Sequence, residues 1–472
     1  MVIATADRLV VFGITGDLAR KMTLPSLYRL EDRGLLPCDV IGVAFDDGDD
    51  DSLRARARQA IVDSEADDHG AIDEDVFARL AAKLSYLHGD FTDPELYDRL
   101  KVQLGGAERP AFYLEIPPAL FGPVVERLGA AGLTTNARVA VEKPFGTDLA
   151  SARALNQRLH AVIAEEQLFR VDHFLGKEPV QDILYLRFAN AMLEPIWHRG
   201  QVDSIQITMA EAFGVEDRGS FYDRVGTLRD VVQNHLLQVL ALTLMDAPGP
   251  GADAVPDEQV DLFHAIRPID PAKAIRGQYT GYRSIAGVDP ASDTETFVAL
   301  RLELDSWRWS GVPVIIRAGK QLPVTATEIV VRFRKVPKLR IGGQVWAPPG
   351  HDDVVLRIGQ GPGIGSGVTF GLRVKEPGRD VSEPVDLSVD FSTALGDPPW
   401  PYERLLRDLL VGDRTLFPAW PSVEATWSIV APLLENPPPV QPYAPGTWGP
   451  EAAEAFARGH GGWRTPKPPP PS

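Results

Sequence analysis

The sequence predicts two domains: an α/β domain built on a parallel sheet, then an α+β domain with a large, mainly antiparallel sheet. Strand-like and helical segments alternate over roughly the first 175 residues, and strand-like segments with little helix between them follow. With 472 residues, 44% of them hydrophobic, the chain has enough apolar material for more than one core. We expect domains at 1–175 and 176–455, followed by a proline-rich C-terminal tail at 456–472.

The first domain is expected to contain βαβ units. Its strand-like and helical segments alternate, beginning with a strand, at residues 9–12, 18–31, 40–44, 52–64, 111–116 and 120–131. Strands separated by helix-length segments are typical of a parallel sheet covered by helices.

The second domain is expected to contain mainly antiparallel strands. The strand-like segments are residues 296–304, 328–334, 354–358, 368–374 and 385–391. In the last of these, Val385, Leu387, Val389 and Phe391 alternate with polar residues. This period of two predicts a sheet with one buried and one solvent-facing side.

Composition excludes several classes of partner and site. The net charge of -17 disfavours nucleic acid and anionic membranes, which are bound through positive surface. The single cysteine, Cys38, cannot form an internal disulfide, and no Cys/His cluster predicts a metal site. There is no basic leader and no apolar run long enough to cross a bilayer. We therefore expect a cytoplasmic protein without metal, nucleic acid or membrane partners.

Two glycine-containing motifs lie at the ends of expected strands. GITGDLA, residues 13–19, follows the first strand and opens a helix, where glycines let the backbone approach a pyrophosphate; a plain strand-to-helix turn is the alternative. EKPFG, residues 142–146, follows another strand, and its Lys143 either bridges a cofactor and a substrate or is an ordinary loop lysine.

Two further motifs carry cationic side chains. RVDHFLGKE, residues 170–178, joins a strand expected at 168–171 to the next helix. If the helix has already begun after Val171, His173 and Lys177 share one face and suit a phosphate monoester; a solvated helix start is the alternative. Lys320 ends the motif RAGK, where it is either an anion contact or part of a hairpin exit.

A histidine lies in an apolar helix expected at residues 228–240. His235 of DVVQNHLLQ is either a buried core histidine or a general base, and a base needs a carboxylate to orient its ring. Asp230 precedes it by five residues, which is about 140° around an α-helix. Asp230 is therefore poorly placed, and the orienting carboxylate must come from elsewhere.

These five motifs, in this order and at these separations, resemble those of the glucose-6-phosphate dehydrogenase family from about residue 8 to about residue 435. The resemblance implies a Rossmann-like coenzyme domain and a β+α domain whose antiparallel sheet forms a homodimer interface. It implies oxidation of the C1 hydroxyl of glucose 6-phosphate to 6-phosphogluconolactone with NADP or NAD, the first step of the oxidative pentose phosphate pathway. A homotetramer and an activator protein stay open.

The resemblance also implies roles for matching residues. His235 is the expected base, oriented by Asp172. The residues expected at the substrate are His173, Lys177, Glu211, Asp230, Lys320 and Lys143. The residues expected at the cofactor are Gly13, Thr15, Gly16, Asp17, Leu18, Ala19, Asp46, Asp90, Phe91 and, again, Lys143.

The sequence departs from the family pattern after the second strand. NADP-selective members usually carry an arginine where this chain has Phe45, and Asp46 follows it. A carboxylate here favours free ribose hydroxyls and repels a 2′-phosphate. NADP is the family default, yet Phe45 and Asp46 favour NAD; Arg20 and Lys21 are the residues that would offset the repulsion.

A second departure is Thr325, which stands where many relatives have a lysine or arginine, so one cationic substrate contact is expected to be missing. Two alternative functions compete with this interpretation. A dehydrogenase of another sugar phosphate or free sugar is opposed by His173 with Lys177, and a catalytically inactive NAD(P)-sensing protein by the retention of His235 with Asp172.

Overall fold

The computed structural model describes residues 5–68, 71–251, 254–337, 339–341, 344–346, 350–359, 365–379, 382–396 and 398–466. The chain divides into two compact units. Unit 1 comprises Met1–Glu178, Pro248–Asp257 and Pro399–Glu424, and unit 2 comprises Pro179–Ala247, Glu258–Pro398 and Ala425–Ser472. The end of the expected tail, residues 467–472, lies outside the described residues.

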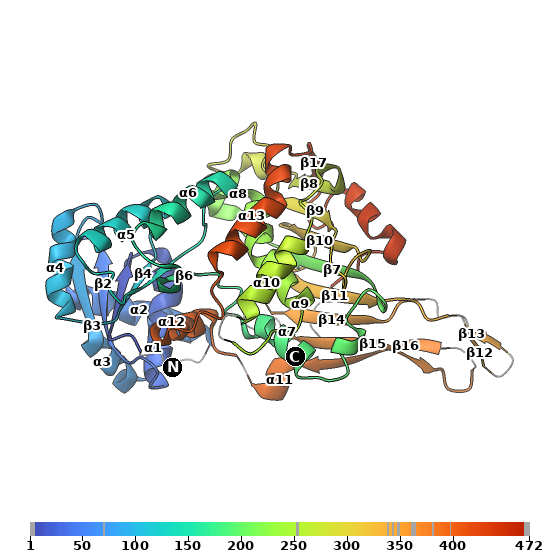
Figure 1. The fold of residues 1–472 in the computed structure, drawn as a ribbon, viewed down its shortest axis with the longest axis horizontal. Helices are drawn as coiled ribbons and strands as arrows, with labels where there is room; N and C mark the ends of the chain where they lie inside the picture. Colours follow the sequence, from blue (N-terminus) through green and yellow to red (C-terminus); the bar gives the residue numbers. More distant parts are fainter. Residues whose placement is uncertain are drawn as a thin grey trace. The chain divides into compact units, whose positions relative to one another are not determined.

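Unit 1 contains a parallel sheet, sheet A, in the order β3-β2-β1-β4-β5-β6 (Figure 1). Its strands are β1 Arg8–Phe12, β2 Asp39–Ala44, β3 Leu84–His88, β4 Pro110–Leu114, β5 Arg138–Val141 and β6 Leu168–Arg170. The strand order reverses between β1 and β4, which pair with Phe12 opposite Leu114. In open α/β sheets, this reversal marks the crevice where ligands bind at the carboxyl ends of the strands.

Helices connect and cover these strands. They are η1 Ala19–Thr23, α1 Leu24–Asp32, α2 Asp50–Asp68, α3 Glu74–Lys83, α4 Pro94–Leu104, α5 Phe121–Ala130, α6 Leu149–His160 and α12 Pro401–Val411. Helices α4, α5 and α6 pack against apolar side chains of sheet A, and Val10 and Phe12 of β1 are fully buried among them. The remaining helices form a second group in which α1 contacts α2, α3 and α12.

Aspartates determine where several of these helices begin. The Asp73 carboxylate accepts hydrogen bonds from the backbone N–H groups of Asp75 and Val76 at the start of α3. Asp93 accepts one from Glu95 at the start of α4, and Asp148 accepts one from Ser151 at the start of α6. Each bond satisfies a backbone donor that the first helical turn leaves free.

Unit 2 contains sheet B, in the order β16-β15-β14-β11-β7-β10-β9-β8-β17. Its strands are β7 Val202–Ala210, β8 Ala274–Tyr279, β9 Phe297–Leu302, β10 Val314–Gly319, β11 Ala326–Phe333, β14 Asp353–Ile358, β15 Gly367–Lys375, β16 Ser382–Asp390 and β17 Val440–Tyr443. Only the β10–β7 and β17–β8 pairs of this order are parallel. A short ribbon pairs β12 Leu339–Ile341 with β13 Gln344–Trp346.

Helices in and around unit 2 include α7 Glu178–Phe188, α8 Gly219–Thr227, η6 Leu228–Leu236, α9 Leu237–Leu244, α10 Ala254–Ala265, α11 Phe391–Leu395, α13 Trp420–Glu435 and η9 Glu451–Phe456. Every residue of α9 is buried, as its apolar sequence predicts. The predicted fold class is thus confirmed: a parallel α/β sheet in one unit and a mixed, mostly antiparallel sheet in the other. In the described part of the chain, no helix is both long enough and apolar enough to span a bilayer.

One expectation about the second sheet is wrong. The alternation in β16 is present, but its apolar side chains are not buried: Val385, Leu387 and Val389 are 45%, 56% and 42% exposed. β16 is an edge strand that pairs only with β15 in the sheet order, and both of its faces are accessible. The period of two identified the strand but not the burial of its apolar face.

Buried arginines attach the C-terminal segment to sheet B. The guanidinium of Arg317, on β10, lies 4.2 Å and 4.6 Å from the ring centres of Trp448 and Trp463, and it donates to the carbonyl oxygen of Arg464 at 2.7 Å. Arg332, on β11, donates to the carbonyl oxygens of His460 and Gly462. Residues 448–464, which we call the C-terminal strap, are thereby fixed across central strands of the sheet.

We predict that Arg317→Met lowers the free energy of unfolding by about 2–4 kcal/mol, because it removes two cation–π contacts and the charged donor to a half-buried carbonyl group. Urea unfolding followed by tryptophan fluorescence measures the change. Arg267→Met is the matched control, since Arg267 forms an exposed bidentate pair with Asp305 and should leave the urea midpoint nearly unchanged. Equal midpoints for the two variants would contradict this account of the strap.

Candidate functional site

A tight turn follows β1 in unit 1. Gly13 has a φ of +88°, and a β-carbon added to it would lie 2.2 Å from the backbone oxygen of Glu115. The N–H of Gly13 donates to Val43 at 2.7 Å, and the N–H of Gly16 donates back to Gly13 at 2.8 Å. Only glycine fits this backbone path. The turn therefore brings the end of β1 against the end of β4 at the reversal of strand order.

Charged residues after the turn are already paired. The carboxylate of Asp17 lies 2.7 Å from Lys21 Nζ and 3.3 Å from the Arg20 guanidinium. Lys21 and then Arg20 hold the pKa of Asp17 below its ordinary value. Arg20 also lies 3.7 Å from Asp63. The two cations that would offset repulsion of a 2′-phosphate are thus partly neutralised.

The segment after β2 presents Phe45 and acidic side chains to solvent. The Phe45 ring is 70% exposed, and Asp46 is exposed. Their backbone is held in place, because the Tyr86 hydroxyl donates to the Asp46 carbonyl oxygen at 2.5 Å and a ring nitrogen of His88 lies 3.1 Å from the Phe45 carbonyl oxygen. The segment has an ordered backbone and an open acidic surface.

The two residues expected at the cofactor after β3 have different surroundings. Asp90 is exposed and accepts hydrogen bonds at 2.8 Å from the backbone and the hydroxyl of Thr92, which lower its pKa. Phe91 packs edge-on against Phe12, with ring centres 5.6 Å apart, and joins the core. Phe91 therefore has a structural role at the carboxyl edge of the sheet.

Carboxyl groups follow β4 and β5 at Glu115, which is half-buried with its Oε2 buried, and at Glu142, which is buried. The sequence analysis missed both. Glu115 accepts a short hydrogen bond from the Thr23 hydroxyl. Glu142 accepts hydrogen bonds from the hydroxyls of Tyr113 at 2.5 Å and Tyr402 at 3.4 Å. Burial raises the pKa of Glu115 to about 8 and that of Glu142 to about 7. The sequence signal for both residues is a glutamate directly after a buried apolar strand. Of this pair of strand ends, only Lys143, beside Glu142, is predicted from the sequence.

The segment carrying Asp172, His173 and Lys177 is a turn, and α7 begins only at Glu178. The condition for a shared helical face is therefore not met, and that argument for His173 and Lys177 is wrong. The segment is instead a turn that packs closely against the start of α12. A β-carbon on Gly176 would lie only 2.7 Å from the carbonyl oxygen of Pro401.

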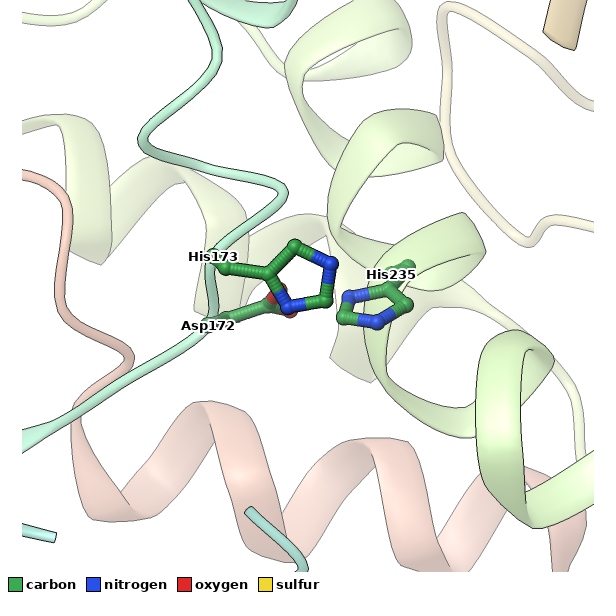
Figure 2. Close-up of side chains that lie close together, drawn as sticks. All are labelled: Asp172, His173 and His235. Atoms are coloured by element: carbon green, nitrogen blue, oxygen red, sulfur yellow. The ribbon is translucent and has the colours of Figure 1, made fainter. Parts of the chain in front are cut away.

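Within this turn the side chains are ordered by local contacts. Asp172 is 3% exposed and accepts a hydrogen bond from the backbone of Phe174 at 2.9 Å. The His173 ring stacks nearly parallel to Tyr402, with ring centres 6.4 Å apart, and Lys177 Nζ lies 4.0 Å from the centre of the Phe174 ring. In Figure 2, Asp172 and His173 project from this segment, which follows β6.

In unit 2, strand ends bring Glu211 and Lys320 together. Glu211 follows β7 and Lys320 follows β10, two paired strands, and their charged atoms lie 2.6 Å apart. Lys320 Nζ also lies 4.9 Å and 5.3 Å from the ring centres of Phe213 and Tyr222. The sequence predicted both charged residues but not their ion pair, which only the strand pairing decides.

Thr325 has a different role from the one its sequence position suggested. Its hydroxyl accepts a hydrogen bond from the backbone N–H of Ala212 at 3.1 Å. Thr325, at the position where a cation was expected, therefore fixes the backbone next to Glu211.

His235 and Asp230 lie on η6, which is a π-helix and not the expected α-helix. A π-helix links residues five apart by backbone hydrogen bonds, so the angle of about 140° does not apply here. Gly226, with φ 68° and ψ 169°, breaks the helical path near the end of α8, two residues before η6 begins. His235 is 2% exposed, and Figure 2 shows its ring projecting from this helix.

The chain matches two models that together cover most of its length. The model "Glucose-6-phosphate dehydrogenase, NAD binding domain" matches residues 10–182, and "Glucose-6-phosphate dehydrogenase, C-terminal domain" matches residues 184–464. Glucose-6-phosphate 1-dehydrogenase 1 of Mycobacterium tuberculosis is 53% identical over 462 residues, covering 98% of this chain and 97% of the relative.

Solved structures give the same result. A glucose-6-phosphate 1-dehydrogenase from Mycobacterium avium superimposes with a TM-score of 0.90 at 50% identity, covering 99% of this chain and 100% of the other. A glucose-6-phosphate dehydrogenase in complex with its substrate glucose-6-phosphate superimposes with a TM-score of 0.88 at 31% identity, covering 98% and 100% of the two chains. On the sequence match alone, which spans both units, the chain belongs to the glucose-6-phosphate dehydrogenase family.

Proposed function

We propose that this chain oxidises glucose 6-phosphate at C1 with a nicotinamide cofactor, giving 6-phosphogluconolactone and the reduced cofactor, as the first step of the oxidative pentose phosphate pathway. The observation that carries the proposal is the near full-length identity of 53% to a curated enzyme of this activity. The retained motif residues of both units support it, because a protein that only senses the cofactor needs no base.

His235 acts as the base in this reaction. Its imidazole takes the proton of the C1 hydroxyl while the hydrogen on C1 leaves with its electron pair for the cofactor, and a C1=O bond forms. Asp172 orients the ring and stabilises the imidazolium, as a carboxylate does for a catalytic histidine. The burial of His235 supports this role, since water does not compete for its ring.

The substrate is held through its phosphate and hydroxyl groups. His173 and Lys177 bind the phosphate as donors with charge, and Lys143 contacts substrate and cofactor. Glu211, Asp230 and Lys320 bind sugar hydroxyls. The 2.6 Å pair of Glu211 with Lys320 supports this assignment, because the ion pair holds the carboxylate in place as a fixed acceptor.

The GITGDLA turn would hold the cofactor, with Gly13, Thr15, Gly16, Asp17, Leu18 and Ala19 at its pyrophosphate. The bound group would supply the hydride acceptor. Asp46 would accept hydrogen bonds from the adenosine ribose, and Asp90 and Phe91 would contact the same half. We propose a preference for NAD over NADP, because Asp46 is exposed and the nearby Arg20 and Lys21 are paired with Asp17.

A homodimer forms through the outer strands of sheet B. Leu372 and Val374 of β15 and Val385, Leu387 and Val389 of β16 are all between 42% and 56% exposed. Leu372 lies opposite Val385, and Val389 opposite the buried Val368, so these apolar side chains share one face. A face of this kind is typical of an interface between identical subunits.

We place the protein in the cytoplasm. Its one cysteine, Cys38, is a buried free thiol whose pKa is raised by burial to about 12, as suits a chain that folds without disulfides.

Replacing His235 with Asn should lower kcat by about 10²–10⁴-fold, because this is what proton transfer to a positioned base contributes. Binding of glucose 6-phosphate should change little, since the phosphate is held by other residues. Stopped-flow reduction of the cofactor and equilibrium binding measure the two effects. His264→Asn, at an exposed histidine of α10, is the control and should be silent. Near-normal turnover of the His235 variant would remove His235 from the mechanism.

Phe45→Arg should raise the ratio of kcat/KM for NADP to kcat/KM for NAD by about tenfold or more, because a guanidinium pairs with the 2′-phosphate. Steady-state reduction of each cofactor with saturating glucose 6-phosphate gives the ratio. Phe45→Met keeps an apolar side chain and serves as the control. The assignment of Phe45 and Asp46 fails if wild type already prefers NADP strongly and the arginine changes nothing.

Leu387→Asp should weaken dimerisation by about a hundredfold, because it places a charge at the centre of the apolar face. Sedimentation velocity at several protein concentrations measures the dissociation constant. Val102→Asp changes another exposed apolar residue, 82% exposed on α4, and should leave the dimer intact. A Leu387 variant that stays dimeric would place the interface elsewhere.

A further inference from the structure

We propose that Glu115 is a proton-exchanging positioning residue for the cofactor, which makes binding of the oxidised nicotinamide, but not the reduced one, release a proton. The inference rests on the proposed use of a nicotinamide cofactor. The inference adds Glu115 to that function and links the protonation of Glu115 to the oxidation state of the bound cofactor.

The position of Glu115 follows from the topology of sheet A. Glu115 directly follows β4, and Gly13 directly follows β1, the two strands between which the strand order reverses. The backbones of these residues are in close contact, since a β-carbon on Gly13 would meet the Glu115 oxygen at 2.2 Å. A dinucleotide crosses a Rossmann-like sheet at this reversal, with its adenosine over the β2 side. The nicotinamide half therefore lies on the side of β4 and β5.

The carboxyl group of Glu115 is only partly satisfied by the protein. Its Oε1 accepts from the Thr23 hydroxyl, while its Oε2 is buried and has no hydrogen-bond partner among the described residues. Among the described residues no cation acts on the titration of this carboxyl group, and its charged neighbour is Glu142. Such a carboxyl group binds a proton when no cation faces it.

The groups that act on Glu115 come from three other elements and its own strand. Thr23 on η1 favours the ionised form by donating, and the neighbouring Glu142 disfavours it. Tyr113 of β4 and Tyr402 of α12 also interact with Glu115 electrostatically. With its pKa raised to about 8 by burial, Glu115 is mostly protonated at pH 7.

The charge of the cofactor ring decides whether this proton stays. The oxidised nicotinamide is a cation, so it stabilises the Glu115 carboxylate, and the carboxyl proton goes to solvent on binding. The reduced nicotinamide is neutral and gives no such stabilisation. Both cofactor forms carry the same pyrophosphate, so its effect on the ionisation of Glu115 is the same for the oxidised and the reduced form. Affinity for the oxidised form should therefore rise with pH through the titration of Glu115, relative to the reduced form.

Calorimetric titration of the full-length protein with the oxidised and the reduced cofactor, each in phosphate and in Tris at pH 7.5, measures the protons released. Wild type should release a fraction of a proton with the oxidised form beyond that with the reduced form. Glu115→Gln should abolish this difference and weaken oxidised binding relative to reduced binding, by up to about tenfold for each unit by which the ring lowers the pKa of the carboxyl group.

Two further variants keep the test decisive. Glu108→Gln, at a carboxylate 77% exposed before β4, should release protons as wild type does. Thr23→Val removes the donor to Glu115 and should move the pH dependence upward, which tests the coupling even if the Glu115 variant does not fold. Equal release with both cofactor forms, or release that persists in Glu115→Gln, overturns the inference. Failure of wild type to bind either cofactor counts against the proposed function instead.

Discussion

The close approach of β1 and β4 is the constraint on which the cofactor unit depends. Because Gly13 has no side chain and a positive φ, its backbone lies against the carbonyl group of Glu115. The same contact places a carboxyl group beside the turn. The backbone of Gly13 and the carboxyl group of Glu115 therefore lie next to each other at the carboxyl edge of sheet A.

In unit 2, the candidate site residues lie at the ends of strands of a large mixed sheet. The parallel pairing of β7 with β10 brings Glu211 and Lys320 to the same edge, and a threonine hydroxyl fixes the backbone next to them. On the central strands, the aromatic and hydrogen-bond partners of Arg317 fasten the C-terminal strap. The outer strands keep an exposed apolar face, which matches the needs of subunit association and not those of a core.

Several site residues were identified from sequence for reasons that the structure changes. His173 and Lys177 belong to a turn and not to a helix, so stacking on Tyr402 and on Phe174 orders them in place of helical spacing. His235 lies on a π-helix, whose spacing the apolar pattern of the segment does not reveal. Arg20 and Lys21 were considered as partners of a 2′-phosphate, yet Asp17 already engages both.

By itself the sequence determined the fold class of the two domains, the glycine turn, the family and the residues that carry its motifs, because these depend on local periodicity and on residue types at short spacing. The tertiary structure decided which side chains are paired, buried or exposed. The raised pKa of Glu115 results from burial by residues that are distant in sequence. The apolar face of β16 is exposed because the described part of the chain does not cover it. Burial and electrostatic coupling depend on residues distant in sequence, and no pattern within one segment contains them.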